Sequence, residues 1–287
     1  MNKSLSGTSG TLYVVASSIG NPQDLSPRAL ETLRTADLVL AEDTRSARKL
    51  LENHGIDRRT QSCFDANEPA RAEQAATLLR SGASIALLSE AGTPTVSDPG
   101  YRVVRAAITA GARVVPVPGP SAVLAALVGS GLPTDRFLFL GFPPRKAGAR
   151  QELLEQVRAL PATLVFFESP HRVAATLGDL AAVLGKDRPA CLCRELTKTH
   201  EEFVRGTLAE LLTRYETDRP LGEVTLLVGG ASAQEQGDGY SEEKMQARAR
   251  ALLASGLSVR DAADALASDT GRPRRETYRL VLDLRAR

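Results

Sequence analysis

Short apolar runs alternate with longer stretches of mixed polarity along most of the chain. In the first half, the apolar runs predict buried strands at 12–16, 38–41, 84–88 and 113–117. In the second half, they predict strands at 137–140, 163–167, 189–194 and 224–228. The stretches between them predict helices at 69–81, 101–110, 121–129, 151–159 and 171–184, and a helix capped by Ser26 with Pro27 in its first position. Strands and helices that alternate in this way indicate an α/β fold.

This alternation is interrupted once, and its character changes again near the C-terminus. A segment rich in glycine and proline follows residue 129, so we place a domain boundary there. The tail contains helical stretches separated by glycine-containing turns, as in a small helix-turn-helix unit. The predicted organisation is an N-terminal α/β domain at 11–128, a second α/β domain at 129–232 and, after a polar linker, a helical unit at 240–287.

Charge and hydropathy narrow the function only slightly. The net charge of +2 is too small to indicate nucleic-acid binding by the whole surface. Residues 240–287 contain ten basic and seven acidic side chains, so the tail is +3 and the rest of the chain is −1. Residues 1–10 lack the apolar core of a signal peptide, and no apolar run reaches the length of a membrane span. We therefore expect a soluble, cytoplasmic protein without membrane attachment.

The cysteines and histidines offer no metal site. Three residues of each type do not reproduce a zinc-ligand spacing. We expect Cys191 and Cys193 to point to opposite faces of a strand, which argues against joint metal binding. We therefore predict no metal.

Two loops rich in glycine and proline, each following an apolar run, point to a small-molecule pocket. They span residues 89–100 and 116–122. Glycine lets the backbone approach a ligand, and proline fixes the loop. Ligands of open α/β sheets bind at loops that follow the carboxyl ends of the strands.

Ten motifs follow one another in an order that resembles the ribosomal RNA small subunit methyltransferase I family, a branch of the tetrapyrrole methylase superfamily. The resemblance covers roughly residues 11–285. The motifs are Ser18-Ile19-Gly20-Asn21, Ala41-Glu42-Asp43-Thr44-Arg45, Asn67-Glu68, Ala91-Gly92-Thr93-Pro94 with Ser97-Asp98-Pro99-Gly100, Pro118-Gly119-Pro120-Ser121-Ala122, Gly131-Leu132-Pro133, Gly141-Phe142, Glu168-Ser169-Pro170-His171-Arg172, Arg194-Glu195-Leu196-Thr197-Lys198 and Gly222-Glu223.

The resemblance implies a reaction, a cofactor and an assembly. It implies S-adenosylmethionine-dependent methylation of a cytidine ribose 2′-hydroxyl in the decoding region of small-subunit ribosomal RNA. It also implies a homodimer, and two α/β domains with the cofactor in the cleft between them. Ser18 and Glu90 depart from the family pattern, which usually has proline and aspartate at these places. Residues 64–66 lack the histidines that the family often has.

Carried onto this sequence, the resemblance and the loop chemistry give two sets of site residues. Glycine can admit a ligand closely, and a helix N-terminus offers free amides. The cofactor-binding set is Ile19, Gly20, Glu90, Thr93, Ser121, Ala122 and Phe142. A ribose hydroxyl is a weak acid that needs a base or a cation nearby. The catalytic candidates are Glu168, His171, Glu195 and Lys198, and the base stays unassigned among them. Glu168 and Glu195 have the alternative role of pairing with Arg172 and Arg194.

RNA binding is predicted at three basic places. One segment contains Arg145, Lys146 and Arg150 with no acidic residue between them. This segment either contacts RNA phosphates or is an ordinary solvated surface loop. A second candidate patch lies near the last helix and consists of Arg272, Arg274, Arg275 and Arg279. Asp43 and Arg45 either hold the target nucleotide or hold each other.

Two rival functions remain on sequence alone. A methylase of the same fold could act on a tetrapyrrole of the precorrin type, but the basic tail and the Arg145–Arg150 segment favour RNA. A non-catalytic nucleic-acid-binding protein would leave the glycine- and proline-rich loops without a role. A nicotinamide dehydrogenase is disfavoured because no G-x-G-x-x-G turn follows the first strand.

Overall fold

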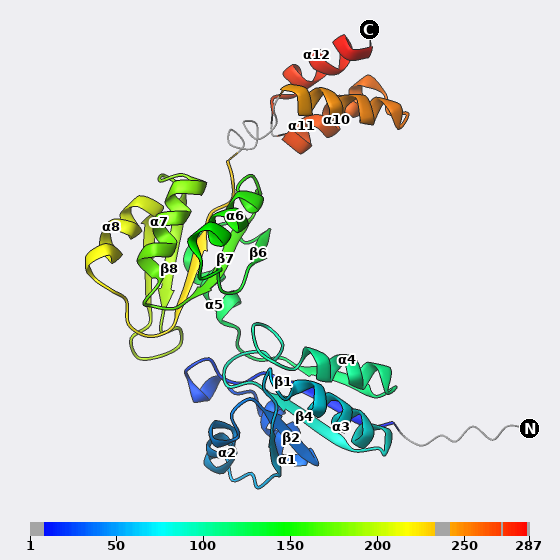
Figure 1. The fold of residues 1–287 in the computed structure, drawn as a ribbon, viewed down its shortest axis with the longest axis vertical. Helices are drawn as coiled ribbons and strands as arrows, with labels where there is room; N and C mark the ends of the chain where they lie inside the picture. The colour runs from blue at the N-terminus through cyan, green and yellow to red at the C-terminus, as the bar shows by residue number, and fades with distance from the viewer. Residues whose placement is uncertain (1–8, 233–241, 271, 286–287) are drawn as a thin grey trace, which may run out of the picture. The chain divides into compact units, whose positions relative to one another are not determined.

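The computed structural model describes residues 9–232, 242–270 and 272–285, and its chain divides into two compact units (Figure 1). The first unit runs to Ala126 and also includes Glu195–Glu202. The second unit contains Leu127–Arg194 and the chain from Phe203 onward. The segment Glu195–Glu202 therefore belongs to the first unit although the chain on both sides of it belongs to the second.

The first unit is built on a five-stranded sheet in which every strand pairing is parallel. Its order is β3-β2-β4-β1-β5. The strands are β1 (Thr11–Val15), β2 (Leu38–Ala41), β3 (Thr60–Ser62), β4 (Ser84–Leu88) and β5 (Arg113–Val117). The three central strands, β2, β4 and β1, are mostly apolar because helices cover both faces of a parallel sheet.

Helices pack on both faces of this sheet (Figure 1). One core joins the sheet to α1 (Pro27–Thr35) and α2 (Thr44–Asn53). The other core joins it to α3 (Glu68–Arg80) and α4 (Tyr101–Thr109). The helix start at Pro27 is confirmed, because the Ser26 side chain accepts a hydrogen bond from the Ala29 amide at 3.1 Å. A short 3-10 turn, η1 (Pro22–Asp24), precedes α1.

The second unit contains a mixed five-stranded sheet of order β6-β7-β10-β8-β9. Its strands are β6 (Phe137–Phe139), β7 (Thr163–Glu168), β8 (Pro189–Arg194), β9 (Glu202–Thr207) and β10 (Val224–Val228). Strand β10 is antiparallel to both β7 and β8. One face of the sheet packs against α6 (Ala147–Val157), α7 (Val173–Leu184) and α8 (Leu208–Thr217). Helix α5 (Ala122–Ser130) carries the chain from the first unit into the second.

The prediction for Cys191 and Cys193 is wrong. Residues two apart on a strand share a face, because side chains alternate with a period of two. Accordingly, both thiols are buried and their sulfurs lie 3.7 Å apart. The described residues contain no group of three His, Cys, Asp or Glu side chains able to hold a metal ion.

Three C-terminal helices pack on one another around a small core of their own. They are α10 (Glu242–Ala254), α11 (Val259–Thr270) and α12 (Arg274–Arg285). Most of the predicted linker at 230–240 lies outside the described residues. Among the helices that the structure describes, none is long and apolar enough to cross a membrane.

Candidate active site

The topology of the first unit puts the loop after β4 at a switch point of the sheet. The loops after β1 and β2 lead to helices on one face, whereas the loop after β4 leads to α4 on the other face. Strands β1 and β4 are neighbours in the sheet. The connection after β1 runs to β2 on one side, and the connection after β4 runs to β5 on the other side. Ligands of open α/β sheets bind at such points. The predicted cofactor residues Glu90 and Thr93 lie in this loop.

Direct contacts connect the loop after β1 to the loop after β4. The Ser17 amide donates to the Gly92 carbonyl at 2.8 Å. A Cβ built on Gly92 would lie 3.3 Å from Cγ2 of Ile19, which is buried. The loop after β5 is also close, because a Cβ on Gly119 would lie 2.9 Å from Cβ of Ala16. The loops after β1, β4 and β5 thus lie against one another.

The predicted helix N-terminus at Ser121 and Ala122 is present at the end of this third loop. The Ser121 carbonyl accepts from the Ala125 amide at 2.8 Å, and its hydroxyl lies 3.5 Å from the Leu124 amide. Ser121 therefore caps α5, which begins at Ala122. The free amides of a first helical turn are a favourable place for an anionic group such as a carboxylate.

A fourth loop brings two of the four catalytic candidates, Glu195 and Lys198, to the same place. The Asn21 amide donates to Oγ1 of Thr197 at 3.1 Å. A Cβ on Gly20 would lie only 2.5 Å from Cγ of Lys198, so the lysine stem packs directly on this glycine. Nζ of Lys198 lies 2.9 Å from Oε1 of Glu195. A lysine–glutamate ion pair therefore lies against the predicted cofactor loop.

Unusual backbone conformations concentrate in two of these loops. Within the described residues, the positive-φ positions other than glycine are Thr95, Ser97, Glu195 and Thr197. Such angles cost energy for a side chain with a Cβ, especially for β-branched threonine. Strained residues of this kind cluster at functional sites. No sequence signal indicates them, because neither threonine nor glutamate favours this region.

A buried carboxylate that the sequence reasoning did not use fixes the end of the loop after β4. Glu68, at the start of α3, is 6% exposed. Its Oε1 accepts from the Gly100 amide at 2.9 Å and from the Arg102 amide at 2.7 Å. Glu68 thereby caps α4 from a neighbouring helix. Asn67 stabilises the turn before α3, where its Oδ1 accepts from the Phe64 amide at 2.8 Å.

Carboxylates gather where β2 and β4 end. Partial burial and the negative charge of Glu90 raise the pKa of Glu42. Burial, followed by the charges of Glu42 and Glu90, raises the pKa of Asp98 to about 6. The pKa of Asp43 is lowered instead, because Arg45 donates hydrogen bonds to it. Of the two roles considered for Asp43 and Arg45, the structure shows the mutual one, with 2.9 Å between Nη2 and Oδ2.

These groups fit S-adenosylmethionine, which is a cation that also carries an adenosine and a carboxylate. The carboxylates of Glu42, Glu90 and Asp98 suit its positive charge. The Ser17 hydroxyl, in a side chain only 1% exposed, has no hydrogen-bond partner among the described residues. Buried polar groups normally have a partner, so a ligand group is a reasonable one for this hydroxyl.

The charge on Asp98 should lower the free energy of unfolding of the protein. Its pKa of about 6 in the folded state lies above its ordinary value of 3.8, so the ionised form destabilises the fold. We expect Asp98→Asn to raise the free energy of unfolding at pH 8 by on the order of 2 kcal/mol. The gain should shrink between about pH 6 and pH 4, as the wild-type carboxyl becomes protonated. Urea unfolding at several pH values measures this.

Asp37→Asn is the matched control, with the opposite sign. The Ser84 amide and hydroxyl, both at 2.8 Å, lower the pKa of Asp37, so its charge stabilises the fold. This variant should lose stability at pH 8. A gain for Asp98→Asn that did not vary with pH would contradict the assignment of a raised pKa.

Two predicted catalytic residues lie in the second unit, and both have other partners. Glu168, whose side chain is fully buried, accepts from Oγ1 of Thr176 at 2.5 Å and lies 3.5 Å from Nε of Arg172. Of the two roles considered for Glu168, the structure shows the pairing with Arg172, and the catalytic role stays a prediction. Nε2 of His171, an exposed residue, lies 2.6 Å from a guanidinium nitrogen of Arg219. Since a guanidinium only donates, His171 accepts through Nε2.

The three basic residues predicted to bind RNA in the segment after β6 differ in their exposure. Arg145 and Lys146 are exposed. Arg150 is only 5% exposed, and its Nε donates to Asp179 at 2.6 Å. The RNA-binding prediction for Arg150 is therefore wrong, because α6 begins at Ala147 rather than at 151 and turns this side chain into the interior. Phe142 lies in the second unit, exposed, with its ring 5.7 Å from that of Phe167.

The predicted tail residues also differ from each other. Nη2 of Arg274 donates to Asp264 at 2.8 Å, and its Nε makes a second contact with the same carboxylate. This bidentate ion pair connects α12 to α11. Arg275 is exposed. Arg274 thus contributes to helix packing, and Arg275 is the more accessible of the two.

Comparison with known proteins agrees with this geometry. The family described as Tetrapyrrole (Corrin/Porphyrin) Methylases matches residues 11–212. Among solved structures, the uroporphyrin-III C-methyl transferase of Thermus thermophilus complexed with S-adenyl homocysteine aligns with a TM-score of 0.55 at 21% identity, covering 76% of this chain and 97% of that one. Diphthine synthase aligns with a TM-score of 0.59 at 19% identity, covering 77% and 90%.

Closer relatives cover nearly the whole chain. The ribosomal RNA small subunit methyltransferase I of Mesorhizobium japonicum is 48% identical over 96% of this chain and 92% of its own. The protein of that name from Synechocystis is 44% identical over 96% and 99%. The one from Escherichia coli O157:H7 is 42% identical over 98% of both.

The chain belongs to the tetrapyrrole methylase family, which confirms the predicted α/β fold class. Within that family, it belongs to the ribosomal RNA small subunit methyltransferase I group. It is an enzyme, an S-adenosylmethionine-dependent methyltransferase.

Proposed function

We propose that the enzyme methylates the ribose 2′-oxygen of a cytidine in the decoding region of small-subunit ribosomal RNA, in the cytoplasm. The observation that carries the choice of RNA is the extent of similarity. The alignments with relatives named as ribosomal RNA methyltransferases cover 96–98% of this chain, whereas the alignment with the uroporphyrin enzyme covers 76%. A tetrapyrrole substrate would leave the additional part of the chain without a role.

The four loops of the first unit would hold S-adenosylmethionine, which supplies an electrophilic methyl group when bound. Ile19, Gly20 and the amides near Ser121 and Ala122 offer close backbone approach. Glu90 offers a negative charge, and Thr93 a hydroxyl beside it. Positioning of this kind accounts for much of the catalysis of a displacement, because the reacting atoms must be in line.

The Lys198–Glu195 pair would assist loss of the hydroxyl proton. An ammonium close to the ribose stabilises the negative charge that develops on its oxygen. Glu195 holds that ammonium at 2.9 Å and provides a carboxylate that can accept a proton. This pair is the better choice because Glu168 is buried and His171 is already bonded to Arg219.

A comparison of two acceptors tests the choice of substrate. Labelled S-adenosylmethionine is incubated with small ribosomal subunits from cells that lack the protein, and separately with uroporphyrinogen III. Label in the ribosomal RNA alone is the expected result. Label in the tetrapyrrole alone would overturn the RNA proposal and retain the enzyme class.

Arg145 and Lys146 would contact RNA phosphates. Hydrogen bonds from Arg150 and Arg172 to the carbonyl of Pro144, at 3.2 and 3.1 Å, anchor the backbone just before them. Two exposed cations on an anchored segment suit phosphate contacts, which position a protein on RNA.

Neutralising Lys146 should lower affinity in a salt-dependent way. Each phosphate contact contributes a little under one unit to the slope of log K against log salt, so Lys146→Gln should reduce that slope by roughly 0.8. Filter binding to small subunits at several salt concentrations measures it. Lys186→Gln, at another exposed lysine of the same unit, is the control. Equal slopes for Lys146→Gln and wild type would reject the contact.

The enzyme would work as a homodimer. Support comes from exposed apolar side chains four residues apart on α5, Leu124 at 52% and Val128 at 77%. Side chains at this spacing lie on one side of a helix. Sedimentation equilibrium should give twice the mass of the chain, and a monomer at micromolar concentration would overturn the dimer.

A further inference from the structure

Helix α12 exposes a basic and apolar surface. The helix buries Thr277 and Val281. At about 100° per residue, four exposed side chains follow one another over an arc of roughly 100° on its outer side. They are Tyr278, Leu282, Arg275 and Arg279, which together form the α12 face. Tyr278 is 42% exposed and Leu282 is 47% exposed, so both are accessible to a partner.

The two arginines of this face have no partner within the part of the chain that the structure describes. Neither Arg275 nor Arg279 makes a side-chain ion pair or hydrogen bond with any residue that the structure describes. Arg274, one position earlier, is paired with Asp264 instead. Two cations on the α12 face are therefore available to a partner, whereas Arg274 is not.

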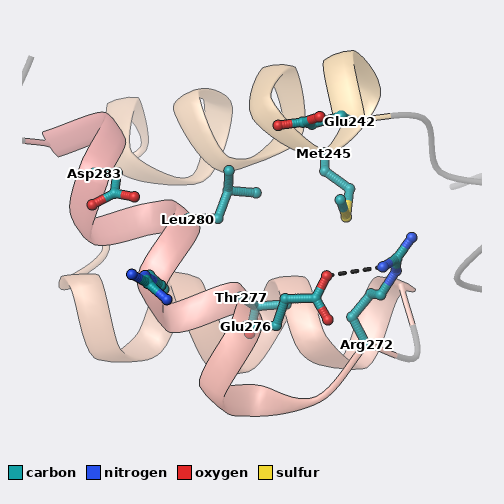
Figure 2. A pocket seen from close by; sticks show the side chains of 8 residues that line it. Glu242, Met245, Arg272, Glu276, Thr277, Leu280 and Asp283 are labelled. Atoms are coloured by element: carbon teal, nitrogen blue, oxygen red, sulfur yellow. Dashed lines mark hydrogen bonds and ion pairs between the residues drawn. The ribbon is translucent and has the colours of Figure 1, made fainter.

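The acidic side chains of α12 lie beyond the edge of this face. Glu276 and Asp283 line a hollow of about 410 Å³ (Figure 2), and Arg279 at the edge of the α12 face lines it as well. Glu242 of α10 also lines it, and Nη1 of Arg272 donates to Glu276 at 2.8 Å. Carboxylates around this hollow disfavour a polyanion there. Arg279 therefore lies at the border between the α12 face and this acidic hollow, whereas Arg275 does not line the hollow.

We infer that the α12 face docks on ribosomal RNA, an inference that rests on the proposed function. Guanidinium groups bind phosphates with geometric specificity, which suits Arg275 and Arg279. The ring of Tyr278, beside these cations, suits stacking on an unpaired base, and Leu282 extends its apolar contact. An acidic protein surface would also bind the arginines, but an aromatic ring on the same face adds a contact that nucleotides favour.

Binding of the full-length protein to two probes tests this inference. The probes are small ribosomal subunits from cells that lack the protein, and the RNA extracted from those subunits. Arg275→Gln with Arg279→Gln should weaken binding to both probes about tenfold and lower the salt slope by roughly 1.5. Tyr278→Ala should weaken binding about fivefold or more, whereas Tyr278→Phe, which keeps the ring, should bind as wild type.

The control removes the same charge elsewhere in the helical unit. Arg250→Gln with Arg260→Gln neutralises two exposed arginines on α10 and α11. Equal losses in this control and in the α12 variant would overturn the inference, since the net charge alone would explain both. Unchanged affinity of the α12 variant would also overturn it. A loss on subunits with no loss on extracted RNA would assign the face to a ribosomal protein.

The outcome is separable from the proposed function. Affinity for S-adenosylhomocysteine should be unchanged in every variant, which shows that the cofactor site is intact, and an unchanged far-ultraviolet circular dichroism spectrum shows that the helical unit is folded. A wild-type protein that binds RNA through the α12 face but transfers no methyl group would retain this inference and overturn the proposed reaction.

Discussion

Replacing Lys198 with alanine lowers kcat for methyl transfer to small ribosomal subunits by about a hundredfold or more. The variant loses the ammonium that lies 2.9 Å from Glu195 and that would stabilise the developing charge on the ribose oxygen. General acid–base and electrostatic groups contribute factors of about 10² to 10⁴ in related chemistry. Single-turnover assays with saturating S-adenosylmethionine measure the chemical step directly.

A loss of catalysis must be separated from a loss of binding. The dissociation constant for S-adenosylhomocysteine should change by less than about threefold in Lys198→Ala, because a group that acts only in the transition state contributes little to ground-state affinity. Glu195→Gln should show a smaller loss, since the lysine retains its charge. A Lys198→Ala variant with wild-type kcat would exclude this residue from the chemistry.

Replacing Gly20 with alanine should abolish most activity through displacement of a loop. The new Cβ would lie 2.5 Å from Cγ of Lys198 and 3.1 Å from the Leu196 carbonyl, and the glycine has a φ of +155°. The lysine stem could move, but the Leu196 carbonyl belongs to the strained backbone between Glu195 and Thr197. We expect kcat/KM to fall about a hundredfold, as misplacement of reacting groups by about 1 Å does. Isothermal titration should also show weaker binding of S-adenosylhomocysteine.

Gly111→Ala is the matched control. Gly111 also has a positive φ, of +74°, but a Cβ there would meet nothing within 4 Å. The control therefore also places a Cβ at a positive φ, with backbone strain of about 1 kcal/mol, without a contact at the active site. Its activity should equal that of wild type. If both variants lost activity equally, backbone strain rather than the contact with Lys198 would be the cause.

Much of the fold could be predicted because its strands are buried. Strands covered on both faces are continuous apolar runs, which is why β2 and β4 could be placed from sequence. The edge strands β3 and β9 are short or polar and carry no such signal. Helix α8 could have been found, because Thr207 and Glu210 form a capping box with hydrogen bonds of 3.2 and 2.7 Å.

The candidate site could be predicted in part. The loops after β1, β4 and β5 follow from the strand order of an α/β sheet and from their glycines. The position of Lys198 could not be predicted, because Thr197 bonds to Asn21 across 176 residues of chain. Sequence also could not distinguish Arg150 from Lys146, since only the start of α6 decides which of them is buried. The carboxylate of Glu68 acts through the Gly100 and Arg102 amides, which no local motif reveals.

The most direct test of the central claim is to map the methyl group on the RNA. Small ribosomal subunits from cells that lack the protein are incubated with it and labelled S-adenosylmethionine, and the RNA is then digested to nucleosides. The account predicts label in 2′-O-methylcytidine from the decoding region, and none in the matched Lys198→Ala reaction. Label on a base, on another nucleotide, or in equal amount with Lys198→Ala would contradict it.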